Sequence, residues 1–385
     1  MTDVGLDDTL AVPQGDFVLR RHGQVGAEPL RAWDAADEYV LHELDGLDLG
    51  PGGRWLVVDD GSGALVVALA AACGGRIVGW TDSRVTELAT VENLRRNGLD
   101  PDAVELVPST EPPRGPFDRV IVKVPRTKAH LDDLLRRLRP QLADEAVVIG
   151  AGMTKSVHRS TIEAFETHLG PTSTSLARKK ARLLRPVIAR DLVASDRPSP
   201  ESVEWTGPDG LVVTGLPNVF SSNGLDAGTR LLVDHLPALP PGGVAVDLGC
   251  GTGVGAATIA SRCPGVLVVC CDESHQAVAA ARSTVGRVTD DATFRVIDVL
   301  DGVEDESADL IVVNPPFHAG GARTTSVARR MFTEARRVLR PGGTLLVVGN
   351  RHLGHHVHLK RIFGSVETVA SNPKFVVLGA RRRGR

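Results

Sequence analysis

The 385 residues carry 44 Lys and Arg against 47 Asp and Glu, and 42% of them are hydrophobic. This composition is that of an ordinary globular protein of two or three domains, and the net charge of −3 excludes nucleic-acid binding by overall charge. The five cysteines lack any C-x-x-C spacing, which argues against a disulfide framework and a structural zinc site. With an acidic N-terminus and no long apolar run, we expect a cytoplasmic protein without signal peptide, membrane span or metal.

Strand and helix patterns alternate through the first half of the chain. Apolar runs predict strands over 55–58, 76–81, 118–123 and 146–150, and Ala- or Leu-rich segments predict helices over 35–44, after 63 and over 129–138. Such alternation is typical of a parallel sheet covered by helices on both faces.

The second half repeats this pattern more clearly. We expect strands over 244–248, 266–271, 294–297, 309–313, 344–348 and 375–378, with a helix over 327–339. Four of these strands end in a polar residue, in turn Asp247, Asp272, Asp298 and Asn314. Open α/β sheets bind their ligands at the carboxyl ends of the strands, so these four residues mark the candidate site.

The first half looks like a degenerate copy of the second. Asp59 matches Asp247 at an offset of 188, Asp82 matches Asp272 at 190, and Asp118 matches Asp309 at 191. The alternative is two unrelated α/β domains with similar strand and turn patterns. In the first copy Leu65 stands where we expect Gly253, and Lys123 stands where the second copy has Asn314. We therefore predict an inactive first domain (1–195) kept for binding, or else as folding ballast, a linker near 196–201, and a catalytic domain (205–385).

Two motifs carry the chemistry of the second half. The turn Asp247-Leu248-Gly249-Cys250-Gly251-Thr252-Gly253 would let backbone N–H groups approach a ligand at a helix start, although dinucleotide sites use a similar turn. Asn314-Pro315-Pro316-Phe317 resolves the ambiguity, because together the motifs resemble class I S-adenosylmethionine-dependent methyltransferases that act on nitrogen.

This resemblance implies a role for each residue. Gly249, Cys250, Gly251 and Gly253 would pack on the methionine part of the cofactor, and Asp247 would order the turn or hold the ligand ammonium. Asp272, followed by Glu273, would hold the ribose hydroxyls, and Asp298 would contact the adenine.

Asn314 and the Pro315 carbonyl can both accept hydrogen bonds from an exocyclic amino group, whose nitrogen is otherwise a poor nucleophile. Pro315 and Pro316 offer no competing N–H, and Phe317 offers a face for a base that has left its helix. Most of the rate acceleration would then come from orientation.

Residues 151–190 hold eight Lys and Arg against two acids. We predict that this basic segment binds RNA phosphates, although a solvated helix face would explain the same composition. The residues proposed for this contact are Lys155, Arg178, Lys179, Lys180 and Arg182.

Further motifs narrow the resemblance. Asn218-Val219-Phe220-Ser221, Asn350-Arg351-His352-Leu353 and Asn372-Pro373-Lys374-Phe375 resemble the family of ribosomal RNA large subunit methyltransferase G, as does Lys179-Lys180-Ala181-Arg182 in the first half. Asp298 departs from that family, in which Asn is expected.

The family resemblance implies two tandem seven-stranded methyltransferase domains, of which the first binds no cofactor. It further implies S-adenosylmethionine as cofactor, guanine N2 of 23S rRNA as target and a monomer. The alternatives are a small-subunit (16S) rRNA guanine-N2 methyltransferase, a protein-glutamine methyltransferase and a non-catalytic RNA-binding assembly factor. The His352–His358 cluster lacks acidic or Cys ligands and is not assigned a metal.

Overall fold

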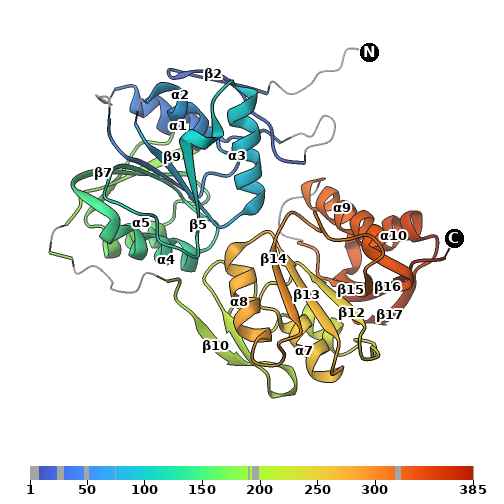
Figure 1. The fold of residues 1–385 in the computed structure, drawn as a ribbon. Coiled ribbons are helices and arrows are strands. Elements are labelled where there is room, and N and C mark those ends of the chain that lie inside the picture. Colours follow the sequence, from blue (N-terminus) through green and yellow to red (C-terminus); the bar gives the residue numbers. More distant parts are fainter. Residues whose placement is uncertain are drawn as a thin grey trace, which may run out of the picture. The chain divides into compact units, whose positions relative to one another are not determined.

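The computed structural model describes residues 8–23, 30–46, 52–73, 75–189, 191–192, 199–316 and 322–384. The chain divides into two compact units, Met1–Glu201 and Ser202–Arg385. Each unit contains one seven-stranded sheet flanked by helices (Figure 1). Of the predicted linker, residues 196–198 lie outside the described part of the chain.

The sheet of the first unit has the strand order β5-β4-β3-β6-β7-β9-β8, in which only β9 runs antiparallel to its neighbours. A short hairpin, β1–β2, precedes it. The elements are β1 (Thr9–Val12), β2 (Gly15–Val18), α1 (Ala35–Leu44), β3 (Trp55–Val58), α2 (Ala64–Ala72), β4 (Ile77–Thr81), α3 (Arg84–Arg96), β5 (Val104–Pro108), β6 (Phe117–Lys123), α4 (Lys128–Leu138), β7 (Leu142–Met153), α5 (Arg159–His168), β8 (Thr172–Thr174) and β9 (Ala181–Pro186).

The sheet of the second unit has the same arrangement, β14-β13-β12-β15-β16-β18-β17, with β18 antiparallel to its neighbours. A hairpin, β10–β11, opens this unit. Its elements are β10 (Val203–Thr206), β11 (Val212–Gly215), α6 (Ala227–Val233), β12 (Val244–Leu248), α7 (Val254–Arg262), β13 (Leu267–Asp272), α8 (His275–Val285), β14 (Ala292–Val296), β15 (Ala308–Val313), α9 (Ala322–Val338), β16 (Leu339–Asn350), α10 (His355–Phe363), β17 (Glu367–Ser371) and β18 (Phe375–Arg381).

The central strands of the second sheet are buried on both faces, which explains their nearly continuous apolar sequence. Alternate residues point to opposite faces. Val246 and Leu248 of β12 pack with α9 and α10, and Ala245 packs with α6, α7 and α8. The two faces therefore form two separate apolar clusters.

Identical strand order confirms the prediction of one fold used twice, and the strand register now fixes the equivalent residues. Val58 lies opposite Trp80 and Val122, as Leu248 lies opposite Cys271 and Val313. The pairing of Asp118 with Asp309 is confirmed, because the two carboxylates make equivalent hydrogen bonds of 2.8 Å. Asp118 accepts from the N–H of Arg54, just before β3, and Asp309 accepts from the N–H of Val244, at the start of β12.

The other two predicted pairings were wrong by one or two residues. Asp59 follows Val58 as Gly249 follows Leu248, and both have a positive φ, 61° and 74°. Thr81, rather than Asp82, is equivalent to Asp272, because each accepts a hydrogen bond from the serine two residues on. The predicted pairings matched Asp with Asp, whereas the strand register shows that these acids occupy different positions in the two sheets.

The prediction that Leu65 replaces Gly253 was also wrong. Gly63 and Gly253 are the equivalent residues, with φ of 79° and 75° immediately before α2 and α7. A Cβ on either glycine would lie 2.7 Å from the Cα of Thr90 or Ala281 in the following helix. Both units therefore need glycine here for close helix packing, and Leu65 corresponds to Gly255 instead.

Candidate active site

The four predicted polar residues meet at the carboxyl edge of the second sheet. Asp247 is the fourth residue of β12, Asp272 ends β13, and Asn314 directly follows β15. Because β13 and β15 both flank β12, their ends are neighbours, and Asp298 follows β14 beside β13. The fold thus brings together residues that are up to 67 positions apart in the sequence.

The turn after β12 has left-handed backbone at alternate residues, with φ of 74° at Gly249 and 52° at Gly251. Residues with a Cβ atom rarely adopt this backbone conformation, which explains why both positions are glycine. Cys250 is buried between them, and its hydrogen bond with Cys270, together with burial, raises the pKa of its thiol well above the usual value. The thiol therefore stays protonated and packs as a small apolar group.

Asp247 orders the turn into α7. Its Oδ2 accepts a hydrogen bond from Ala256 N at 2.9 Å, and a Cβ on Gly255 would lie only 2.8 Å from that oxygen. Burial, with the nearby Asp272 carboxylate, raises the pKa of Asp247 to about 7. Of the two predicted roles, ordering the turn is visible in this geometry.

Asp272 connects two helix starts. Its Oδ2 accepts from Gly251 N and its Oδ1 accepts from Ser274 N, both at 3.0 Å. These two contacts fix the carboxylate at the start of the loop before α7 and at the start of α8. Glu273 follows directly. Asp298 forms an ion pair with Arg330 of α9, which sequence analysis did not anticipate.

Asn314 is fixed by a residue of α6. Its Nδ2 donates to Thr229 Oγ1 at 3.0 Å, which leaves Oδ1 as the acceptor on the other side of the carboxamide. Asp226 begins α6 by accepting from the N–H groups of Gly228 and Thr229. Sequence analysis missed Asp226 and Thr229 as site residues, although an Asp two residues before Gly at a helix start is a capping signal. Pro315 and Pro316 follow Asn314, whereas Phe317 lies outside the described residues.

The equivalent place in the first unit is occupied by an ion pair. Lys123 Nζ donates to Asp37 Oδ1 at 2.5 Å and to Asp34 Oδ1 at 3.0 Å. Asp37 lies in α1, and Asp34 is the N-cap residue of that helix. Although burial opposes the charged form, Asp37 and Asp34 raise the pKa of Lys123 above its usual value. The amino group therefore remains a cation inside the first unit.

The predicted RNA-binding residues lie close together on the first unit. Lys155 follows β7, Arg178, Lys179 and Lys180 lie between β8 and β9, and Thr154 N donates to Lys180 O at 2.7 Å. Arg182 lies in β9. Acids from outside the segment neutralise part of its charge, because Glu38 of α1 pairs with Lys179 and Glu43 of α1 pairs with Arg185.

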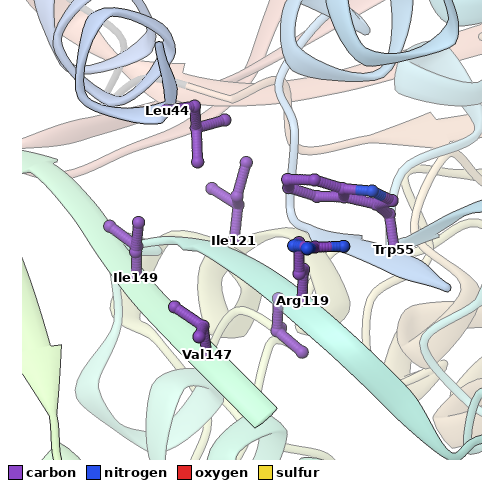
Figure 2. Close-up of a pocket in the computed structure, with 7 residues that line it drawn as sticks. Leu44, Trp55, Arg119, Ile121, Val147 and Ile149 are labelled. Atoms are coloured by element: carbon purple, nitrogen blue, oxygen red, sulfur yellow. The ribbon is translucent and has the colours of Figure 1, made fainter. Parts of the chain in front are cut away.

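A cavity of about 130 Å³ in the first unit lies away from these sites. Figure 2 shows its apolar lining from α1, β3, β6 and β7, with the Arg119 guanidinium 5.4 Å from the Trp55 ring centroid. Arg119 and Trp55 lie near the starts of β6 and β3, opposite the carboxyl edge that carries Lys123. The cavity is therefore no counterpart of the cofactor site.

The His352–His358 cluster shows no metal-site geometry. Within the described ranges, no group of three His, Cys, Asp or Glu side chains is placed to hold a metal ion. His355 packs edge-on against Phe332, and burial lowers its pKa to about 4. In the same ranges no helix is long and apolar enough to cross a membrane.

The fold and the site define a class I methyltransferase with a duplicated domain. Residues 7–190 match the family described as RLMG N-terminal domain, and residues 210–379 match the methyltransferase small domain. The chain belongs to the ribosomal RNA large subunit methyltransferase G family.

Relatives with that name cover nearly the whole chain. The protein from Streptomyces coelicolor is 46% identical over 380 residues, covering 96% of this chain and 99% of the relative. That from Pseudomonas aeruginosa is 43% identical over 376 residues, covering 96% and 98%. The solved 16S rRNA N2 G1207 methyltransferase of T. thermophilus, in complex with AdoMet and guanosine, has a TM-score of 0.77 at 24% identity and covers 97% of each chain.

Proposed function

We propose that this protein transfers the methyl group of S-adenosylmethionine to the exocyclic N2 of a guanine in 23S rRNA. The names of the relatives support large-subunit rRNA as the substrate, and the motif resemblance implies guanine N2 as the target. The geometry of Asn314 supplies the chemical support. Because Thr229 accepts the Asn314 amide hydrogen, Oδ1 of Asn314 is the atom presented to a substrate amino group. The hydrogen bond from Asn314 to Thr229 is the observation on which the proposal depends.

The carboxyl edge of the second sheet fits the cofactor. The bound cofactor would supply an electrophilic methyl group on a positively charged sulfur. Asp272 would accept from the ribose hydroxyls, and Asp298 would stand near the adenine with Arg330 beside it. Asp247, Asp272 and Glu273 give this edge a negative field that favours a cation.

The reaction then needs orientation more than proton transfer. Asn314 Oδ1 and the Pro315 carbonyl would each accept one hydrogen of the guanine amino group, turning its lone pair toward the methyl group. Phe317 would stack on the base once it is flipped out of its helix. The amino proton can leave to water after transfer, so no strong base is required.

The first unit would hold the RNA. Lys155, Arg178, Lys180 and Arg182 offer phosphate contacts. The Lys123 ion pair stands where the second unit has the acceptor Asn314, so the first unit lacks that acceptor. We further propose action by a monomer in the cytoplasm, where the ribosome is assembled.

The test uses rRNA from cells that lack the protein, incubated with methyl-labelled cofactor and purified enzyme. We expect label on guanine N2 of 23S rRNA, at a position found by mass mapping. Label confined to 16S rRNA or to protein would contradict the substrate. Asn314→Ala should abolish labelling while S-adenosylhomocysteine still binds, which a non-catalytic assembly factor would not predict.

A further inference from the structure

Asn350 has a buried carboxamide oxygen without a partner. Among the residues that the structure describes, none donates a hydrogen bond to Asn350 Oδ1. Buried acceptors are nearly always paired in folded proteins, because an unpaired one loses its bonds to water without replacement. An orphan acceptor beside a binding site is therefore expected to meet a donor of the ligand.

Asn350 stands at the same edge of the sheet as Asn314. It is the last residue of β16, which lies next to β15 with Val347 opposite Val313. Asn314 is thus level with residue 348, and Asn350 stands two residues further out. Strand spacing and rise place the two Cα atoms roughly 8 Å apart.

Both carboxamides belong to the same face of the sheet. Val312 and Val348 belong to the apolar cluster under α6 and α7, whereas Val313 and Val347 belong to the opposite cluster. By the alternation of strand side chains, Asn314 and Asn350 lie on the α6 face. Asn350 also pairs with Phe375, a member of that same cluster.

The start of α6 lies beside both residues. Asn314 donates to Thr229 of α6, and a Cβ on the neighbouring Gly228 would lie 3.2 Å from the Phe375 ring. Asn350, opposite Phe375, therefore flanks the position to which Asn314 presents its oxygen. Pairing with β18 and the Arg351 N to Lys374 O hydrogen bond at 3.1 Å hold its backbone.

Guanine presents donors where such acceptors would be useful. Its amino group and its N1–H lie side by side, whereas adenine has an acceptor at N1. We infer that Asn350 Oδ1 accepts from guanine N1–H while Asn314 Oδ1 and the Pro315 carbonyl hold the amino group. This inference rests on the proposed function and assigns Asn350 as the residue that selects guanine.

The test compares RNA with guanine or 2-aminopurine at the mapped target position. 2-Aminopurine keeps the amino group but has an acceptor at N1 and no O6. The wild-type enzyme should prefer guanine in kcat/KM by at least ~10-fold, since a lost hydrogen bond leaves Asn350 Oδ1 facing an acceptor. In Asn350→Ala the guanine rate should fall ~10- to 100-fold and the 2-aminopurine rate should change less than ~3-fold.

Two further variants separate recognition from structure. Asn350→Asp keeps an acceptor and should retain the preference for guanine. Asn372→Ala is the matched control at the same edge, because Asn372 Oδ1 accepts from Lys374 N and Phe375 N and so holds the turn. It should lower thermal stability and leave the guanine preference unchanged.

Equal loss of both substrates in Asn350→Ala, or loss of the preference in Asn350→Asp, would overturn the inference. Failure of the proposed function is a different result, namely no guanine-N2 label from the wild-type enzyme.

Discussion

Asn314 donates to Thr229 at 3.0 Å in the second unit, and the residues at the equivalent places in the first unit, Lys123 and Asp37, form an ion pair at 2.5 Å. In both units the residue at the carboxyl end of β6 or β15 contacts the helix that precedes the central strand β3 or β12. The Asn314–Thr229 hydrogen bond leaves Asn314 Oδ1 available as a substrate acceptor. The Lys123–Asp37 ion pair offers no such acceptor, because Lys123 can only donate. This pair of positions is thus one of the places where the two halves differ in what they offer a substrate.

Thr229→Val should impair catalysis without impairing cofactor binding. The variant removes the acceptor that orients the Asn314 carboxamide, so Oδ1 is no longer held toward the substrate. We expect kcat to fall about 10- to 100-fold, corresponding to about 1–3 kcal/mol for an orienting hydrogen bond. Calorimetry should give an unchanged Kd for S-adenosylhomocysteine. Thr229→Ser is the control, and equal losses in both variants would argue against the orienting role.

Lys123→Met should destabilise the first unit. Removing the cation leaves Asp34 and Asp37 without their partner, which costs about 3–5 kcal/mol for a buried pair. The change is measurable by tryptophan fluorescence during urea unfolding, because three of the four tryptophans, Trp33, Trp55 and Trp80, lie in the first unit. Adding Asp37→Leu should recover part of the loss, and a fully additive double variant would contradict the pairing.

Gly255→Ala should destabilise the wild-type protein and stabilise an Asp247→Val background. In the wild type the new Cβ meets Asp247 Oδ2 at 2.8 Å. Without that carboxylate, alanine gains about 0.5–1 kcal/mol over glycine in a helix. The first unit already shows the compatible combination, Val57 with Leu65. Thermal unfolding of the four proteins in this cycle would show the opposite signs, whereas the same sign in both backgrounds would contradict the clash.

Cofactor affinity should rise with pH through Asp247. Its pKa of about 7 means that the carboxyl is largely protonated at pH 6 and largely ionised at pH 8. Only the ionised form attracts a sulfonium cation, so affinity for S-adenosylmethionine should increase up to about tenfold over this interval. Asp247→Asn should flatten the profile. A slope that persists in this variant would assign the titration to another group.

The RNA affinity of the first unit should depend unequally on its cations. Lys180→Gln or Arg178→Gln should weaken binding and reduce the slope of log K against log salt by about 1 for each lost phosphate contact. Lys179 is already paired with Glu38 at 2.6 Å, so Lys179→Gln should have the smaller effect. Glu38→Gln should release Lys179 and strengthen binding in a gel-shift titration. Equal effects of all three cation changes would contradict this ranking.

Sequence patterns were sufficient for the architecture and for the edge of the sheet at which the candidate site residues gather. Strand ends such as Asp247 and Asn314 could be placed because a parallel sheet gathers its carboxyl ends at one edge. The partners of those residues could not be predicted, since Thr229 precedes Asn314 by 85 positions and only the folded register brings them together.

The alignment of the two halves by residue type failed where the acid that caps the helix stands at a different position in each half. In the first unit Asp60 caps the helix, accepting from Leu65 N and Val66 N, whereas in the second unit Asp247 performs this role from within the strand. A carboxylate at either position reaches the same N–H groups, so residue type alone misled the pairing.

The buried Lys123 cation makes the stability of the first unit depend on its pairing with two acids. Changing Lys123 to Asn would leave Asp34 and Asp37 without their cation, which costs about 3–5 kcal/mol of a stability that is commonly only about 5–15 kcal/mol. Thr81 and Asp59 also stand where the second unit has Asp272 and Gly249. A single substitution at position 123 therefore cannot give the first unit the Asn acceptor of the second unit without a loss of stability.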